Sequence, residues 1–271
     1  MIDLTDTHCH IHSINQPTGE SQTVELWSKL EGGDVSSVVA RAEEGGVSRL
    51  ITVGCTLEDS KLAISTASEY DSVWATIGIH PHEAKDYAGN QANLEAFAGL
   101  ADSNKVVAIG ECGLDYFYNH SDPESQKALL RFQLELANKH DLPVIFHVRE
   151  AFDDFWPILA DFKNTKGVLH SYTDSLANLS KAMELGLYIG VNGIATFAKN
   201  PDLSEVYRQI PIDNLVLETD SPFLTPSPLR GNINEPKNVR LVAEYLSSLR
   251  GENLEDLAAK TTNNARQLFS V

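Results

Sequence analysis

The fold is indicated by the stretch IDLTDT, residues 2–7, which runs directly into the metal-capable HCH, residues 8–10. Short apolar runs of this kind, rich in β-branched residues, recur along the chain, and a helix-like stretch follows each of them. This alternation is typical of a parallel sheet built from βα units. The runs predicted as strands are Ile2–Thr7, Arg49–Gly54, Val73–Ile79, Val106–Glu111, Pro143–His147, Gly167–His170, Leu187–Val191 and Leu215–Glu218.

The segments between these runs have helical periodicity. In Ser125–His140 the apolar residues recur at three- and four-residue spacing, and Pro236–Phe269 reads as two helices broken near residues 251–253. The length of 271 residues is close to the roughly 250 of a typical (β/α)₈ barrel. We therefore predict an α/β fold, a (β/α)₈ TIM-type barrel, regular or distorted, with residues 1–271 as a single domain. A doubly wound open sheet is the alternative, because periodicity alone cannot show closure.

Composition excludes several classes of protein. Hydrophobic residues make up 42% of the chain and charged residues 22%, which argues against disorder and against a fibrous protein. The net charge of −17 disfavours a broad basic face that grips long nucleic acid. The three cysteines form no CxxC element, the first residues lack an export signal, and no apolar run could span a bilayer. We expect a cytoplasmic protein without membrane contact.

Polar side chains that can bind metal fall at the carboxyl ends of the predicted strands, the face on which barrel active sites form. Because side chains alternate along a strand, His8 and His10 point the same way while Cys9 points to the opposite face. The histidine pair can therefore share one ion. Cys9, like Cys112, is expected to be buried and structural.

Five more strand ends carry possible ligands, namely His80, Glu111, His147, His170 and Asp220. Such a cluster without metal would carry heavy costs of desolvation and charge repulsion. Imidazole and carboxylate ligands together favour zinc, manganese or another transition metal, whereas magnesium prefers oxygen ligands and water. Magnesium stays an alternative for activity.

Seven motifs together resemble the TatD-like metal-dependent deoxyribonuclease family, a branch of the amidohydrolase-type barrels. They are DTHCH (6–10), GIHPH (78–82), IGECGLDY (109–116), PVIFHVR (143–149), LETDSPFLTP (217–226), RGNINEP (230–236) and NNARQLF (263–269). The resemblance covers nearly the whole chain, and the combination is highly specific.

The resemblance implies a site with two divalent metal ions. In it, His8 and His10 hold the first ion, Glu111 bridges both, His147 and His170 hold the second, and Asp220 lies beside the first. Two ions bridged in this way lie roughly 3.5–4 Å apart, lower the pKa of bound water and stabilise both oxygens of a displacement.

The chemistry of hydrolysis suggests further roles. Asp220 is the best placed residue to take the proton of the attacking water. His80, Arg149 and Arg230 are candidates for contacts to phosphate and to the leaving group. Two alternatives stay open: Arg149 could instead pair with Glu150 or Asp153, and Arg230 could be a simple loop charge.

Other residues near the motifs have structural alternatives. We expect His82, Asp115 and Glu218 to support the ligands or the structure, because metal-bound imidazoles need carboxylate or carbonyl partners. A set of aromatic residues could stack on bases, with core packing as the alternative for at least half of them. These are Tyr116, Phe117, Tyr118, Tyr172 and Phe223.

Two segments depart from the family pattern. After His170 the chain reads Ser171-Tyr172-Thr173-Asp174, where the family more often ends this motif with glycine. The acidic Asp174 puts substrate preference in doubt rather than the metal site. Residues Ile14–Glu31 form a longer first loop than usual, which is either a cover over the site or a surface insertion.

The leading hypothesis is a deoxyribonuclease that cleaves DNA as an exonuclease at single-stranded ends, with no membrane partner. A monomer is favoured, although the oligomeric state stays open. The second hypothesis keeps the metals but changes the substrate to a small amide, lactone or phosphoester. The third is a non-catalytic barrel that binds a partner protein.

Overall fold

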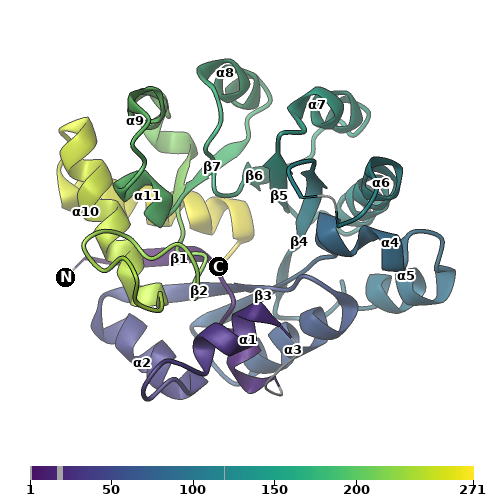
Figure 1. The fold of residues 1–271 in the computed structure, drawn as a ribbon, viewed down its shortest axis with the longest axis horizontal. Coiled ribbons are helices and arrows are strands. Elements are labelled where there is room, and N and C mark those ends of the chain that lie inside the picture. Colours follow the sequence, from purple (N-terminus) through teal and green to yellow (C-terminus); the bar gives the residue numbers. More distant parts are fainter. Residues whose placement is uncertain (1, 17–20, 119) are drawn as a thin grey trace. The chain divides into compact units, whose positions relative to one another are not determined.

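The computed structural model describes residues 2–16, 21–118 and 120–271. Its strands are parallel neighbours in chain order from β1 to β8, and helices alternate with them (Figure 1). A doubly wound sheet would reverse its strand order at a switch point, and this order does not reverse. The chain divides into two compact units, Met1–Thr52 with Ser171–Val271, and Val53–His170.

The first unit contains the strand order β7, β8, β1, β2. β1 (Leu4–Cys9) pairs in parallel with β2 (Val47–Val53), and β7 (Tyr188–Val191) pairs in parallel with β8 (Leu215–Leu217). A parallel bridge between Cys9 and Ser221 connects β1 to the chain just after β8. The first and last strands are therefore neighbours within this unit.

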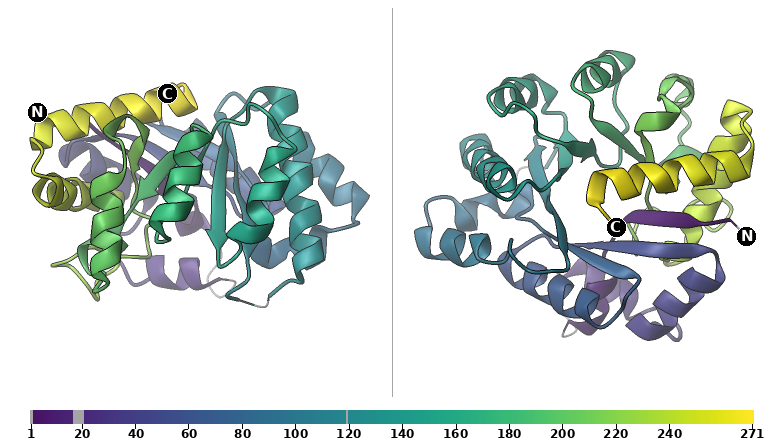
Figure 2. Two further views of the ribbon diagram at one scale, coloured as in Figure 1. Left: turned by 90° about the horizontal axis from the view of Figure 1, so that it is seen from above. Right: turned by 180° about the vertical axis from the view of Figure 1, so that it is seen from behind.

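Helices cover the strands of the first unit. They are α1 (Gln22–Trp27), α2 (Val35–Glu44), α8 (Leu176–Glu184), α9 (Pro201–Gln209), α10 (Val239–Arg250) and α11 (Leu254–Phe269). Figure 2 shows α11, at the yellow end of the chain, alongside β1. Thr262 Oγ1 donates a hydrogen bond to the carbonyl of Asp3, and Asn264 Nδ2 donates one to the carbonyl of Leu215. The two predicted carboxyl-terminal helices are confirmed, and Gly251 ends the first of them with a φ of 67°.

The second unit contains β3 (Val73–Ile77), β4 (Val106–Asp115), β5 (Val144–Arg149) and β6 (Gly167–Leu169), paired in parallel in that order. Its helices are α3 (Leu57–Ser68), α4 (Ala84–Tyr87), α5 (Gln91–Ala98), α6 (Pro123–His140) and α7 (Phe152–Ala160). α6 matches the predicted helix. Its buried Gln133 accepts from the amide of Ile79 and donates to the carbonyl of the same residue.

Five short 3₁₀ turns complete the described part of the chain. They are η1 (Ile11–Asn15), η2 (Pro81–Glu83), η3 (Gly193–Thr196), η4 (Ile212–Asn214) and η5 (Pro236–Asn238). Three of the five, η1, η2 and η3, follow the ends of β1, β3 and β7. They turn the chain away from the sheet close to the predicted ligands.

The predicted strands all exist, although their ends differ from the sequence prediction. β4 continues to Asp115, four residues past the predicted end at Glu111, because it stays paired with β5 up to Asp115 and Arg149. Gly113 allows this pairing, since a Cβ there would lie 1.9 Å from the carbonyl oxygen of His147. Glu111 and Asp115 therefore lie on the same strand, and both belong to its extended backbone.

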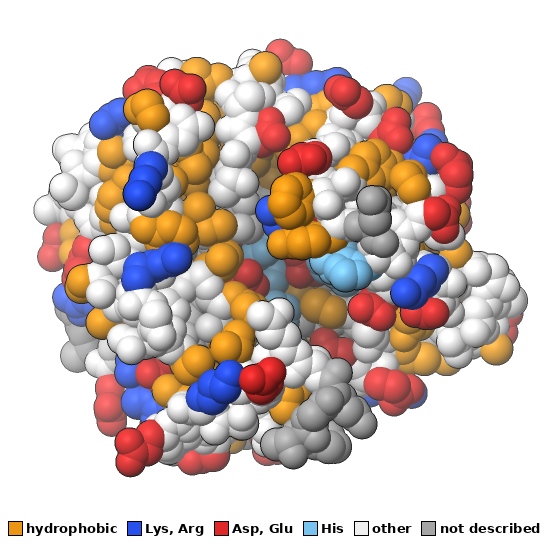
Figure 3. Space-filling view, in the orientation of Figure 1, with side chains coloured by type: hydrophobic (Ala, Val, Ile, Leu, Met, Phe, Trp, Pro, Cys, Tyr) orange, Lys and Arg blue, Asp and Glu red, His pale blue; other side chains and the backbone are white. Residues whose placement is uncertain are grey.

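The surface agrees with the composition. Asp and Glu side chains are spread over the face drawn in Figure 3, and Lys and Arg are fewer. Among the described residues no helix combines the length and the apolar character needed to cross a membrane.

Candidate metal centre

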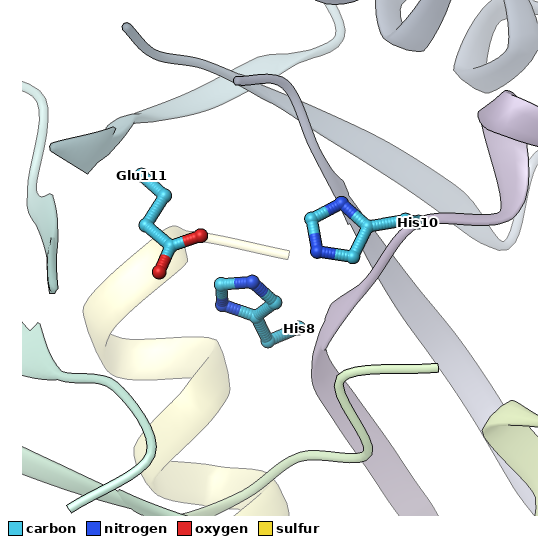
Figure 4. A group of neighbouring side chains, drawn as sticks. All are labelled: His8, His10 and Glu111. Carbon is cyan, nitrogen blue, oxygen red and sulfur yellow. The ribbon is translucent and has the colours of Figure 1, made fainter. Parts of the chain in front are cut away.

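In the first unit, His8, His10 and Asp220 come together. His8 lies on β1 and His10 directly follows it, and Figure 4 shows their rings leaving the strand on the same side, as alternation predicts. Asp220 Oδ1 lies 3.2 Å from His10 Nε2 and 3.7 Å from His8 Nε2. Both histidines are buried. One carboxylate thus faces two imidazoles, a donor set that suits a transition metal.

The backbone fixes this group. Asp220 adopts a positive φ of 58°, its amide donates to the carbonyl of His8, and the amide of His10 donates to the carbonyl of Ser221. Aspartate tolerates this left-handed conformation better than most residues. The indole of Trp27 donates a hydrogen bond of 3.0 Å to the carbonyl of His10. The segment Ile14–Glu31 is therefore anchored to the site through α1, although its residues 17–20 lie outside the described part.

Asp6 is a supporting residue that the sequence reasoning did not single out. It is fully buried, and its two carboxylate oxygens accept from the amide and the hydroxyl of Thr219 at 2.8 and 2.6 Å. Burial raises the pKa of Asp6 to about 8, and these hydrogen bonds oppose the rise. A carboxyl group inside an apolar run is buried only when it has hydrogen-bond partners, and this rule could have identified Asp6.

In the second unit, Glu111 on β4 is the centre of a group of histidines. His147 Nδ1 lies 2.7 Å from Glu111 Oε1, and the Nε2 atoms of His170 and His80 lie 3.6 and 3.9 Å from the same oxygen. One possible ligand atom from each of His80, Glu111 and His147 lies within 4.8 Å of the others. Burial lowers the pKa of His80 well below its ordinary value. An uncharged imidazole of this kind can act as a metal ligand.

Asp115 supports this group. Its Oδ2 lies 2.9 Å from His147 Nε2 and 3.1 Å from His82 Nε2. Burial opposes ionisation of Asp115, but the hydrogen bonds from His147 and His82 outweigh burial and hold its pKa well below the ordinary range. Burial also opposes protonation of His147, yet its bonds to Asp115 and Glu111 raise its pKa to about 9. Asp115 is thus a carboxylate partner of the kind expected for a ligating histidine.

The two arginines proposed for phosphate contact both lie over aromatic rings. Arg149 Cζ is 3.9 Å from the ring centroid of Phe117 and 4.9 Å from that of Tyr118. Within the described residues it forms no ion pair with Glu150 or Asp153, so the alternative pairing is not found. Arg230 Cζ is 3.5 Å from the ring centroid of Phe197. Each guanidinium group is thus held in place by a cation–π contact with an aromatic ring.

Three further polar residues, His12, His140 and Glu218, have structural contacts. His12 is buried, with Nδ1 2.6 Å from Thr52 Oγ1, and His140 lies beside Asp102. Glu218 is buried and accepts from the amide of Ser171 at 2.6 Å, which holds the chain just after His170.

The cysteines and two of the aromatic residues behave as structural groups. Cys9 and Cys112 are buried, as predicted, and Cys9 Sγ donates to the carbonyl of Ile51. Tyr172 is buried and its hydroxyl donates to the carbonyl of Ser175, while the hydroxyl of Tyr116 donates to Asp154. These contacts favour packing over base stacking for both tyrosines.

The residues present fit a metal. In the second unit His147 lies between two carboxylates: Asp115 occupies Nε2, which leaves Nδ1, directed at Glu111, for an ion. This carboxylate, histidine and metal arrangement orients the ring and raises its basicity. A cation would also relieve the cost of burying Glu111 among imidazoles.

Residues 5–270 match the family described as TatD related DNase. The chain belongs to this family. It is 36% identical over 270 residues to an uncharacterized metal-dependent hydrolase, YabD, of Bacillus subtilis, with 99% of each chain covered. It is 39% identical over 256 residues to a protein of Erwinia tasmaniensis named 3'-5' ssDNA/RNA exonuclease TatD, covering 92% of this chain and 98% of that one.

A solved structure of a family member supports the family assignment and the fold. The crystal structure of the TatD homologue YJJV from Escherichia coli K12 superimposes with a TM-score of 0.86 at 31% identity, covering 99% of this chain and 98% of that chain. The predicted (β/α)₈ fold and the predicted family are thereby confirmed. The chain is a metal-dependent hydrolase acting on ester bonds, and the relatives do not favour the alternatives of a hydrolase of a small amide, lactone or phosphoester or of a non-catalytic barrel.

Proposed function

We propose that this TatD-related DNase is an exonuclease that hydrolyses phosphodiester bonds at single-stranded ends of DNA, with two divalent metal ions. The observation that carries the proposal is the group around Glu111, in which three histidines approach one carboxylate oxygen and Asp115 orients one of them. Divalent cations held by such a group would supply the concentrated positive charge that hydrolysis of a phosphodiester needs, because the substrate and its transition state are anionic. We also propose that residues 1–271 act as one catalytic domain.

The proposed ligands are those of the family resemblance. His8, His10 and Asp220 serve one ion, His147 and His170 serve the other, and Glu111 serves both. Ions bound there would lower the pKa of a bound water and would neutralise charge on the phosphate. Zinc and manganese fit the imidazoles best, and magnesium is a weaker fit.

The remaining steps belong to side chains. Asp220, within 3.2 Å of His10, accepts the proton of the attacking water. His80, with its Nε2 atom 3.9 Å from Glu111 Oε1, contacts the leaving oxygen and donates a hydrogen bond to it from its ring N–H. Arg149 and Arg230 contact phosphate oxygens with the edges of their guanidinium groups, since their faces are taken up by aromatic rings.

The polarity of cleavage is proposed from the relatives. The Erwinia tasmaniensis and Klebsiella pneumoniae proteins are named 3'-5' ssDNA/RNA exonucleases, at 39% and 37% identity. We propose the same direction here, with single-stranded DNA as substrate. A cytoplasmic location fits the three free cysteines, and a monomer is the proposed state.

One experiment tests the activity and its direction. A single-stranded 20-nucleotide DNA, labelled at either its 5' or its 3' end, is incubated with protein of measured metal content. With the 5' label, cleavage from the 3' end gives a ladder of shortening products. With the 3' label the same direction releases the labelled nucleotide at once.

Chelator should abolish both patterns, and manganese or zinc should restore them. Turnover of a lactone with no cleavage of DNA or RNA would overturn the proposed substrate. Cleavage of RNA but not DNA would overturn DNA as the proposed substrate, but it would leave the proposed metal-dependent hydrolysis intact.

A further inference from the structure

Two aromatic side chains next to the Glu111 group are exposed to solvent. Phe117 and Tyr118 lie two and three residues after the end of β4, and their exposed fractions are 48% and 42%. They meet edge to face, with ring centroids 4.7 Å apart. Large aromatic side chains are normally covered, and an exposed pair next to a site indicates a binding surface.

Arg149 completes this surface, which we call the ring cluster (Phe117, Tyr118 and Arg149). Its guanidinium lies over both rings, at 3.9 and 4.9 Å. The described residues form no ion pair with this guanidinium. The cluster therefore combines exposed aromatic surface with a cation.

Asp115 connects the ring cluster to the metal ligands. Its Oδ1 accepts hydrogen bonds of 3.0 Å from the amides of both Phe117 and Tyr118, while its Oδ2 lies 2.9 Å from His147 Nε2. One carboxylate thus holds the backbone of the two exposed rings and the ring of a proposed ligand. The position of the ring cluster relative to His147 is fixed by these bonds.

His82 and His120 extend the aromatic surface. The ring of Tyr118 stacks on that of His120 with centroids 5.7 Å apart and an interplanar angle of 29°, and the His82 ring lies 5.5 Å from Tyr118. Figure 3 shows histidine side chains reaching the surface next to hydrophobic ones. The exposed pair thus belongs to a larger group of four neighbouring rings, Phe117, Tyr118, His82 and His120.

We propose that the ring cluster stacks on an unpaired nucleobase of the strand whose end is cleaved, so that Phe117 and Tyr118 select single-stranded over duplex nucleic acid. The proposal rests on the proposed nuclease function and adds its specificity surface. A base inside a duplex has both faces covered by its neighbours, whereas an unpaired base offers a free face to an aromatic ring. Arg149 adds attraction to both the base and its phosphate.

The test compares two proteins on two substrates. The substrates are a single-stranded 12-nucleotide thymidine oligonucleotide and the same backbone with abasic tetrahydrofuran units in place of the two nucleotides at each end. The proteins are wild type and the double variant Phe117→Leu with Tyr118→Leu, which keeps apolar side chains but removes the ring faces. Both are loaded with manganese, and KM and kcat are measured separately.

We expect the double variant to raise KM for the normal oligonucleotide about tenfold, with kcat changed less than threefold. For the abasic substrate the rise in KM should be clearly smaller, because no terminal base is present to stack and only the phosphate contact of Arg149 is disturbed. The preference of wild type for single-stranded over blunt duplex DNA should fall in the variant. The single variant Phe117→Trp, which keeps a ring, should retain the low KM.

A control variant completes the design, and different outcomes would contradict the stacking proposal and the proposed nuclease function. Leu185 is exposed to 47% at the end of α8, and Leu185→Ala should leave KM for both substrates unchanged. An equal rise of KM for normal and abasic substrates in the double variant would overturn the stacking proposal while leaving the nuclease function intact. Absence of cleavage by metal-loaded wild type would instead overturn the proposed function.

Discussion

The donor group of the first unit and the donor group of the second unit are held in different ways. In the first, the backbone fixes His8, His10 and Asp220 through hydrogen bonds between β1 and the chain after β8. In the second, side chains fix one another, because His147 is held between Glu111 and Asp115.

This difference has a consequence for substitution. Removing one side chain of the first group leaves the backbone bonds of the others intact. Removing a carboxylate of the second group frees the imidazole that it orients. Supporting residues should therefore control stability in the first unit and metal affinity in the second.

The largest effect is expected where a ligand itself is removed. Glu111→Ala should lower kcat/KM for single-stranded DNA at least about 10³-fold, since loss of one electrostatic group at a reacting centre already costs about 10²–10³-fold. His8→Ala tests the other donor group in the same way. Elemental analysis should show less bound metal in both proteins. Cleavage at the wild-type rate by either variant would contradict the ligand set.

Substitution of the supporting carboxylates, Asp6 in the first unit and Asp115 in the second, should have different effects in the two units. Asp115→Asn is expected to weaken metal binding about 10- to 100-fold, because it removes the partner of His147 Nε2. Asp6→Asn should instead lower the free energy of unfolding by about 1–3 kcal/mol, because Thr219 loses a buried acceptor. Metal titration and denaturant unfolding measure the two effects. If both variants changed only metal affinity, or both changed only the free energy of unfolding, the proposed difference between the two units would be wrong.

A smaller effect is expected for the arginines that lie over rings. Arg230→Ala in the first unit and Arg149→Ala in the second should each lower kcat/KM for DNA about tenfold, the scale of one lost ionic contact. Arg→Lys at either position should recover little of this, because an ammonium cannot stack flat on Phe197 or Phe117. Steady-state kinetics at two salt concentrations checks the ionic origin. Full recovery by lysine would argue against a stacked guanidinium.

The smallest effect concerns two helix caps far from the chemistry. Thr56 accepts from the amide of Asp59 at the start of α3, and Thr56→Ala should lower the free energy of unfolding by about 1 kcal/mol at any pH. Asp34 caps α2, and hydrogen bonds from Ser36 and Ser37 hold its pKa below the ordinary 3.8.

The stabilisation by Asp34 is therefore present above pH 3.8 and is lost as the pH falls through the lower pKa of the folded state. The difference between wild type and Asp34→Ala should shrink in acid, and that for Thr56→Ala should not. Urea unfolding at pH 7 and pH 3 measures both. Unchanged kcat/KM at pH 7 serves as the control.

The sequence by itself determined the strand and helix order, because apolar runs with period two and helices with period 3.6 are local properties. It also determined that His8 and His10 share a side and that Cys9 does not. The ends of strands were less predictable: β4 continues to Asp115 because pairing with β5 and the missing side chain of Gly113 allow it, and pairing is not a local property.

Only the tertiary structure decided which partner each polar side chain takes. Asp6 and Thr219 are 213 positions apart, and His147 is 32 positions from Asp115. These pairs cannot be found from the local spacing of residues in the sequence, because strand register and burial bring them together. The proposed metal ligands could therefore be located at strand ends from the sequence alone, whereas their orientation, and the exposed rings held by Asp115, arise from contacts between distant segments.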